Sequence, residues 1–500
     1  MQGSGGRILN NIRVMLVGQL ITWAISFVWI IYLPRYIGAT DMGRLAIATA
    51  IWSVMSSIIN TGTATHLTKE IARSPEKAPE FLGTVLIQRY IIFLICCLVV
   101  AAYVYAMSYS KETIVLICII AMTMPASHTI LTLNAIFQGR EVMQYIPLID
   151  ILMKGLTLII SLTCMYLGYG VNEIAAATIV SSGVAVAVQF SILRRYIPIR
   201  FKWNSALSSD ILRRSWPYCL SSLVLLVYGE VDKLIMSVMV DERTVGWYSI
   251  AGSLAATLIF IPNILTTAIF PAMSRGATQG GDGASRILSK SIDFSLITGV
   301  PIGFGLAIVA SPLVDLIYQS KFPQSGAVLS VMSITLIFTY ISTVLGRFLV
   351  ASDRTNAWTL AMVAGIVLAF PLNFVLVPWT EQIYGNGAIG GALRLLFTEF
   401  LMAIFALWIL PSGALTRQNA TTALRILAAG GVMAAACWYV RDMFIAITVL
   451  VGVATYTLMI LALRVLKPED INMVVKATRG ALSGLRMRTR GGDRSGPRDE

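Results

Sequence analysis

The sequence has few charged residues, which make up 13% of its 500 positions, against about 25% in typical soluble domains. Only two histidines occur, His66 and His128, so histidine-based zinc sites and acid–base triads are not expected. The six cysteines lie in apolar stretches without C-x-x-C spacing, which indicates packing residues rather than disulfides or metal ligands. A G-x-x-x-x-G-K-S/T segment is also missing, so we expect no nucleotide hydrolysis, no metal and no cofactor.

Hydrophobic residues, in contrast, account for 57% of the chain. Because a membrane-spanning helix takes about 20 predominantly apolar residues, this composition predicts an all-α integral membrane protein of about 14 transmembrane helices. The predicted spans are residues 14–33, 45–64, 82–105, 113–133, 145–168, 173–192, 216–239, 246–270, 292–317, 325–350, 356–378, 385–410, 419–439 and 443–463.

The positions of the basic residues predict the orientation of these spans, because cytoplasmic loops retain Lys and Arg. Of the 38 basic residues, 29 fall in the N-terminus, the loops after even-numbered spans and the tail, whereas six fall in the opposite loops and three inside spans. We therefore expect a multi-pass protein of the cytoplasmic membrane with both termini in the cytoplasm. The net charge of +13 follows this topology rule, so it does not indicate a nucleic-acid partner.

The loops suggest a domain organisation and argue against an enzyme. We expect an N-terminal six-helix bundle over 1–193, a basic cytoplasmic linker over 194–214, a second six-helix bundle over 215–411, an extra helix pair over 412–465 and a basic cytoplasmic tail over 466–500. The linker interleaves Arg with Trp and Phe, which is typical of a segment lying on anionic membrane lipids. The exterior loops are too short to hold a catalytic domain.

The chain also repeats itself. At an offset of 203, Gly43 matches Gly246, and three apolar positions match in the same register. Later, "YGVNEIAAA" from Tyr169 matches "YGNGAIGGA" from Tyr384 at an offset of 215. Each repeat contains six spans. Because six is an even number, both copies enter the membrane from the same side, which predicts two pseudosymmetric six-helix bundles related by an axis along the membrane normal. The second segment satisfies G-x-G-x-x-G formally, but it joins two spans without a preceding strand and indicates a turn.

The segment from Val231 to Arg275 carries a family resemblance. It contains an Asp232-Lys233 pair within a span, "GWYSIA" at the entry to the next span, and Phe270-Pro271 at its end. It resembles Wzx-type polysaccharide flippases of the MOP exporter superfamily, which have a MATE-like fold. The resemblance implies a flippase that moves polyprenyl-pyrophosphate-linked oligosaccharide across the membrane by alternating access for cell-surface polysaccharide synthesis. It further implies polysaccharide polymerase machinery as a partner and Na⁺ or H⁺ as a coupling ion.

Ionisable residues within or beside spans are the candidate functional residues, because a charge in hydrocarbon is costly and normally faces a cavity or a partner. Cations would suit the pyrophosphate; the candidates are Arg89, Lys154, Lys233, Arg347 and Arg394. Acids would serve in pairing or in ion coupling; the candidates are Asp150, Glu230, Asp232 and Glu399.

The helical spacing of these charges leaves two interpretations open. Asp150–Lys154 and Glu230–Lys233 are spaced to neutralise one another within a helix, or their cations hold substrate. Asp232 points away from Lys233 and is a candidate free acid, whereas Arg394 has no partner at helical spacing.

Two rival functions remain at this point. A cation-coupled multidrug exporter with a MATE-like fold would favour uncompensated carboxylates over the mixed charges found here. A membrane-embedded glycan enzyme is disfavoured by the short exterior loops.

Overall fold

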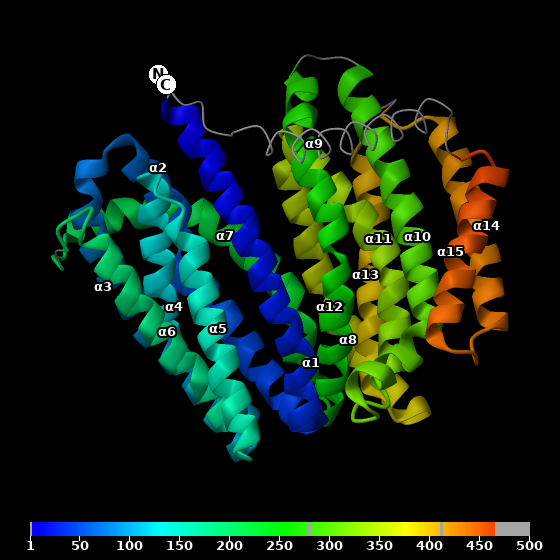
Figure 1. The fold of residues 1–500 in the computed structure, drawn as a ribbon, viewed down its shortest axis with the longest axis horizontal. Coiled ribbons are helices and arrows are strands. Elements are labelled where there is room, and N and C mark those ends of the chain that lie inside the picture. The colour runs from blue at the N-terminus through cyan, green and yellow to red at the C-terminus, as the bar shows by residue number, and fades with distance from the viewer. Residues whose placement is uncertain (1–2, 200, 279–281, 411–413, 466–500) are drawn as a thin grey trace, which may run out of the picture.

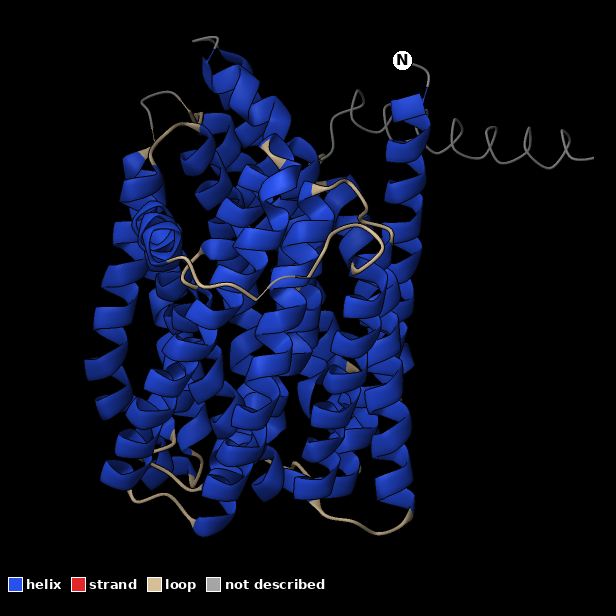
Figure 2. Cartoon of the chain, turned by 90° about the vertical axis from the view of Figure 1, so that its left-hand side faces the viewer, coloured by secondary structure: helices blue, strands red, loops and turns tan. Residues whose placement is uncertain are grey.

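The computed structural model describes residues 3–199, 201–278, 282–410 and 414–465. Over these ranges the chain is helical and contains no strand (Figure 2), which confirms the predicted fold class. The helices of the first half are α1 (Gly3–Asn60), α2 (Thr63–Arg73), the 3₁₀ turn η1 (Pro75–Lys77), α3 (Ala78–Met107), α4 (Lys111–Gly139), α5 (Tyr145–Tyr166) and α6 (Val171–Leu193). Those of the second half are α7 (Ser205–Met236), α8 (Glu242–Leu258), α9 (Phe260–Thr278), α10 (Asp282–Tyr318), α11 (Ser325–Ala351), α12 (Thr355–Tyr384) and α13 (Gly387–Ile409), followed by α14 (Arg417–Tyr439) and α15 (Ile445–Ala462).

The number of membrane crossings agrees with the sequence. Twelve helical segments are long and apolar enough to cross a membrane, and one of them runs for 57 residues, from Val17 to Arg73. That segment provides two crossings, because α1 breaks at Gly38, whose φ of 78° is not helical. The 32 residues of α7 rise about 48 Å at 1.5 Å per residue. This helix is not among the twelve apolar segments, but it is long enough for a fourteenth crossing.

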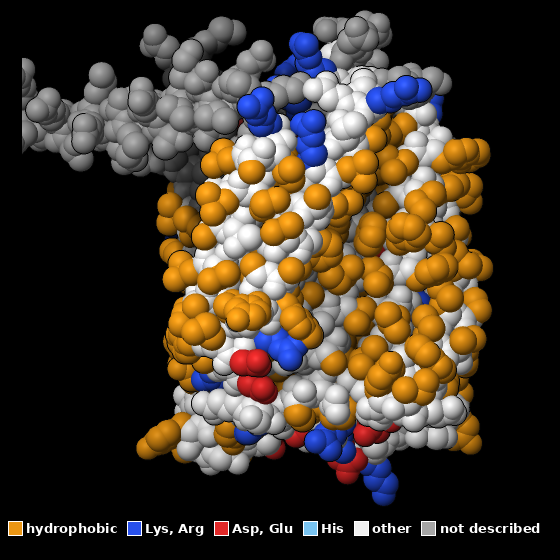
Figure 3. Space-filling model, turned by 90° about the vertical axis from the view of Figure 1, so that its right-hand side faces the viewer, with side chains coloured by type: hydrophobic (Ala, Val, Ile, Leu, Met, Phe, Trp, Pro, Cys, Tyr) orange, Lys and Arg blue, Asp and Glu red, His pale blue; other side chains and the backbone are white. Residues whose placement is uncertain are grey.

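The two ends of the described chain lie on the same side of the molecule (Figure 1). We call the side on which α1 begins and α15 ends the terminal face, and the other side the opposite face. A broad band of hydrophobic side chains separates them (Figure 3). Lys and Arg gather above this band, whereas both signs of charge appear below it, as expected for a helical bundle in a bilayer.

The helices form two lobes. The first lobe contains α1 to α6, and the second contains α8 to α13, with α14 and α15 packed on α10 at the outer edge (Figure 1). Helix α7 joins the lobes: Ser208 near its start hydrogen-bonds Gln88 of α3, whereas Asp232 near its end contacts α12 and α13. Since α7 begins at Ser205, the last ten residues of the expected linker 194–214 are helical. The expected tail 466–500 lies outside the described residues.

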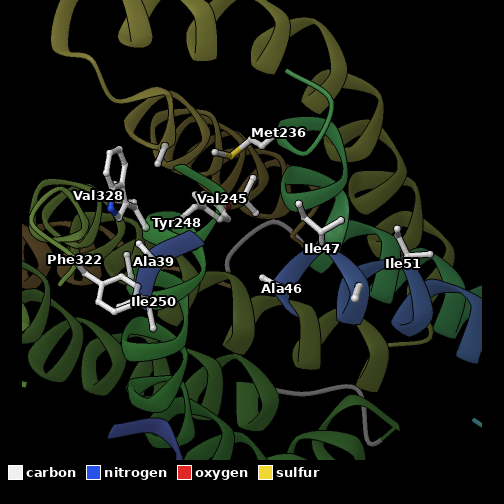
Figure 4. Close-up of a cluster of buried hydrophobic side chains, with 14 of the residues drawn as sticks. Ala39, Ala46, Ile47, Ile51, Met236, Val245, Tyr248, Ile250, Phe322 and Val328 are labelled. Atoms are coloured by element: carbon white, nitrogen blue, oxygen red, sulfur yellow. The ribbon is translucent and has the colours of Figure 1, made fainter. Parts of the chain in front are cut away.

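The largest apolar core crosses the boundary between the lobes. Buried side chains of α1, among them Ala39, Ile47 and Ile51, pack in one cluster with side chains of α8 such as Val245 and Ile250 (Figure 4). The two halves of the protein are therefore held together by apolar packing between α1 and α8, which are equivalent segments of the sequence repeat.

Local sequence explains the helix boundaries near this core. The predicted span 246–270 divides into α8 and α9 just before Pro262, which cannot donate the usual backbone hydrogen bond. The G-x-G-x-x-G segment is a turn: Gly385 has a φ of 61°, and the Asn386 side chain caps α13 by accepting from the Ala388 amide at 3.2 Å. A Cβ at Gly390 would lie 2.6 Å from the Cα of Val377, so this glycine permits α12 and α13 to pack closely. The prediction of a turn is confirmed.

Candidate functional site

The lobes meet at the opposite face through a reciprocal glycine contact. A Cβ built on Gly43 would lie 2.6 Å from the carbonyl carbon of Glu242 and 2.9 Å from the amide nitrogen of Gly246. A Cβ on Gly246 would lie 2.9 Å from the carbonyl carbon of Ala39 and 3.1 Å from the amide nitrogen of Gly43. Glu242 follows Ala39 by 203 residues, and Gly246 follows Gly43 by the same 203. Each helix therefore offers the same patch to the other, which is the signature of a two-fold contact.

Polar contacts reinforce this closure. The Glu242 carboxylate at the start of α8 accepts hydrogen bonds from Ser110 at 2.7 Å and from Thr113 at 3.2 Å, and Arg44 of α1 lies 3.9 Å away. On α10, the Tyr318 hydroxyl donates to the backbone oxygen of Ile30 at 3.2 Å. The second lobe is thus tied to α1 and to the start of α4 at the opposite face.

A buried ion pair occupies the second lobe. Arg394 Nε of α13 lies 2.9 Å from Asp232 Oδ1 of α7, and the two side chains are 0% and 4% exposed. The same carboxylate accepts hydrogen bonds from the Tyr248 hydroxyl at 2.8 Å and from the Asn373 amide at 2.9 Å. Asp232 is therefore not a free acid, and that interpretation is wrong, because its partners come from three other helices. The charge of Arg394 is compensated, and its Nη1 also contacts Thr398 at 3.4 Å.

The two pairs predicted from helical spacing behave differently. Lys233 Nζ lies 2.7 Å from Glu230 Oε2, which confirms neutralisation within α7. Lys154 of α5 forms no ion pair with Asp150 within the described chain; its Nζ donates to the Ser26 hydroxyl of α1 at 3.4 Å instead. The two side chains of α5 therefore make no direct ion pair, although they lie close enough to interact electrostatically.

Arg89 of α3 is fully buried in the first lobe, yet its partners are neutral. Its Nη1 donates to the His128 backbone oxygen at 2.9 Å and to the Thr132 hydroxyl at 2.7 Å. Its Nη2 donates to Asn60 Oδ1 at 2.6 Å and to the Thr63 hydroxyl at 2.8 Å, and Nε reaches the same hydroxyl at 3.3 Å. A guanidinium has five N–H groups, so all of them are used. We call this arrangement the Arg89 cage; it joins the end of α1 and the start of α2 to α4.

The remaining candidates lie in different surroundings. Arg347, one turn from the end of α11, is exposed at the terminal face, where a long cationic side chain reaches lipid headgroups. Glu399 of α13 is buried, and its Oε1 accepts from the Tyr228 hydroxyl at 2.8 Å. Within the described part of the chain, Lys154 is therefore the candidate cation that is half-buried, near mid-span and without a carboxylate partner.

An apolar pocket of about 390 Å³ lies at the seam between the lobes. Its walls are α1 and α3 from the first lobe and α7 and α12 from the second. Two of its side chains, Val99 and Phe374, are more than half exposed. The seam thus offers an apolar surface to a lipid chain from the bilayer.

Sequence reasoning missed several residues of these sites. Tyr248 belongs to the GWYSIA motif, but the motif does not show that its hydroxyl binds Asp232. Asn373 gave no signal, because a single polar residue in a span is common and Asp232 lies far away in sequence. The repeat did contain a signal for the closure, since it aligned Gly43 with Gly246, but alignment alone does not show that two equivalent residues touch.

Two helical lobes related by a pseudo-two-fold axis, each with a buried charge, are typical of a transporter. Residues 8–277 match the model of the polysaccharide biosynthesis protein family, and residues 217–375 match the MatE model. Because the first match spans more than half of the chain, the protein belongs to the polysaccharide biosynthesis protein family, as the resemblance indicated.

Individual relatives agree with this assignment. The chain is 23% identical to the "Putative O-antigen transporter" of Shigella dysenteriae over 80% of this chain and 98% of that protein. It is also 23% identical to the "Probable flippase AglR" of Haloferax volcanii over 65% and 69% of the two chains. Its fold is similar to that of the lipid II flippase MurJ in an inward closed conformation, with a TM-score of 0.68, 16% identity, and 90% and 98% of the two chains covered. An inward-facing MATE transporter of the MOP superfamily gives a TM-score of 0.61 at 15% identity, with 78% and 93% covered.

Proposed function

We propose that this protein is a flippase for lipid-linked oligosaccharide in the cytoplasmic membrane, with the terminal face toward the cytoplasm. The polysaccharide biosynthesis family, and a relative named as an O-antigen transporter that matches over nearly its whole length, support this substrate class. The partition of basic residues supports the orientation. The relatives are transporters and flippases, which agrees with a protein that moves its substrate without chemical change.

One structural observation carries the transport mechanism, namely the reciprocal contact between Gly43 and Gly246. It closes the opposite face between the two lobes, where α1 of the first lobe packs on α8 of the second. Breaking this contact would open the exterior side as one lobe rocks against the other, as alternating access requires. The apolar seam pocket would hold part of the polyprenyl chain while the glycan passes between the lobes.

Lys154 is the residue that we assign to the pyrophosphate. Its ammonium lies near mid-span, beside α1, and forms no direct ion pair with a carboxylate of the described residues. The other cations are less suited: Lys233 and Arg394 are neutralised by acids, and every donor of Arg89 is already used. The basic segment 194–214 would contact anionic lipids, and a polysaccharide polymerase would receive the translocated product.

The proposal is tested by purified protein in liposomes that contain a radiolabelled polyprenyl-pyrophosphate oligosaccharide. We expect the protein to move the glycan to the outer leaflet, where an added glycosidase releases the label. Equal release from protein-free liposomes would refute the function. In cells, the gene should restore surface glycan to a host that lacks its own flippase.

A second candidate, cation-coupled drug export, is favoured by the MatE match over residues 217–375. An efflux assay in a drug-sensitive host distinguishes it. Protection against several unrelated drugs, without glycan translocation, would favour this alternative.

A further inference from the structure

Glu399 is a buried acid that the proposed substrate site does not use. Only 7% of the residue is exposed. The Tyr228 hydroxyl donates to its Oε1 at 2.8 Å, whereas Oε2 has no hydrogen bond of standard geometry in the described chain. Across from it on α11, Thr339 and Ser342 present hydroxyl groups. Ser342 is itself 4% exposed, so its hydroxyl faces the carboxyl away from solvent.

The charges around Glu399 do not balance when it is ionised. Arg394 lies five residues earlier on α13, but its guanidinium is paired with Asp232. With Glu399 ionised, the carboxylates of Asp232 and Glu399 and the guanidinium of Arg394 would together carry a net negative charge inside the lobe. An unpaired charge in the membrane interior costs several kcal/mol. A single proton on Glu399 removes that charge.

Among the described residues, the neighbouring helices supply no other group that could balance the charge of an ionised Glu399. Helix α7 contributes Tyr228, α8 contributes Tyr248, which is bound to Asp232, and α11 contributes the two neutral hydroxyls. On α12 the position packed against Tyr228 is Gly365, which has no side chain to titrate.

A metal ion fits this position poorly. The described residues contain no group of three or more His, Cys, Asp or Glu side chains that could hold a metal. A sodium ion at Glu399 would have one carboxyl and neutral hydroxyls as ligands, and it would lie near the Arg394 guanidinium. A proton instead forms an O–H bond with one carboxylate oxygen and needs no further ligands.

We propose that Glu399 is the proton-binding site that couples transport to the proton gradient. The acid is protonated in this closed conformation. When the lobes rearrange and water reaches α13, the O–H bond breaks and the proton leaves to the cytoplasm, and the reverse occurs from the exterior. This assignment rests on the proposed function for its role in transport, although proton binding itself does not.

Infrared spectroscopy of the purified protein tests proton binding without substrate. At neutral pH we expect the wild type to show the carbonyl band of a protonated carboxylic acid, and Glu399→Gln to lose it. Glu230→Gln is the matched control, because its carboxylate is ion-paired with Lys233 and should contribute no such band. An unchanged band in Glu399→Gln overturns the proposal.

Tyr228→Phe provides a second reading of the same site. The hydroxyl donates to the carboxyl, and such a bond favours the ionised form. Removing it should therefore keep the protonated band to higher pH than in the wild type. No shift, or a shift to lower pH, would contradict the proposed geometry.

Transport in liposomes tests the coupling. Acidifying the exterior side should raise the initial rate of glycolipid transfer by the wild type, and Glu399→Gln should lose this response. Acceleration by a sodium gradient alone, or a retained pH response in Glu399→Gln, would refute proton coupling at this residue. If the wild type moves no glycolipid, the proposed function fails, whereas the infrared result still decides whether Glu399 binds a proton.

Discussion

Adding a methyl group at Gly43 should open the opposite face of the protein. In the closed structure a Cβ there would lie 2.6 Å from the carbonyl carbon of Glu242 and closer still to its oxygen. Carbon–carbon contacts are optimal at about 3.5–4.0 Å, so α1 and α8 would have to separate by about 1 Å or more in Gly43→Ala. Both neighbours are backbone atoms within helices, so neither can turn aside as a flexible side chain would.

The size of the effect follows from the cost of overpacking. Extra methyl groups in a well-packed interior cost about 1–3 kcal/mol. Because the clash exists only while the lobes touch, this cost falls on the closed conformation. A difference of this size changes a two-state equilibrium by about 5- to 150-fold. Gly246→Ala should act in the same way, since its Cβ would meet the carbonyl of Ala39.

A cysteine at Ser249, one turn further into α8 and 6% exposed, can report this change. Native cysteines are first replaced, and labelling by a membrane-impermeant maleimide is then followed from the exterior. We expect labelling to be slow in the parent and at least several-fold faster with Gly43→Ala. Gly252→Ala is the matched control. Its added Cβ would lie 3.9 Å from the Cε of Met332, which is an ordinary van der Waals distance, so it should not separate any helices. Equal labelling rates for Gly43→Ala and the parent, with both proteins folded, would show that this contact does not hold the face closed.

Three further predictions concern the charged residues. Lys154→Gln should reduce glycolipid transfer in liposomes at least tenfold while Lys154→Arg retains most of it; equal activity of the two variants would remove Lys154 from the pyrophosphate site. Arg394→Met should lower the unfolding free energy by about 3–5 kcal/mol because it strands the buried Asp232 carboxylate, and Asp232→Asn added to it should restore most of the loss in a thermal unfolding assay. Replacing Lys233 by Met and Glu230 by Gln together should leave glycan export per membrane-inserted protein near normal, because the two native side chains neutralise one another. A double variant that folds but does not export glycan would instead place Lys233 in the substrate site.

The topology and the repeat could be predicted because they depend on patterns spread over the whole chain. Spans need long apolar runs, so local errors average out. The orientation stays a prediction that depends on where the Lys and Arg residues lie. The Glu230–Lys233 pair was also predictable, because three residues on a helix fix the distance between side chains.

The remaining contacts depend on tertiary packing. Asp232 and Arg394 are 162 residues apart in sequence, so helical spacing suggested a free acid and an unpartnered base where the fold forms a pair. Asp150 and Lys154 have suitable spacing, yet Lys154 finds Ser26 on a neighbouring helix. The partners of Arg89 are a backbone oxygen and neutral side chains, which no search for opposite charges would identify.

The reciprocal glycine contact has a consequence for how such a protein can be assembled. Each half contributes the same surface, with a small residue at its centre and a carbonyl oxygen one turn before it. A chain of only six spans carrying that surface would be self-complementary, and two copies inserted in the same direction would form the same junction as a homodimer. Joining the halves in one polypeptide is therefore not needed to make the closure. The fusion instead frees each copy to diverge, as the neutral cage around Arg89 in one half and the acid–base pair of Asp232 and Arg394 in the other illustrate.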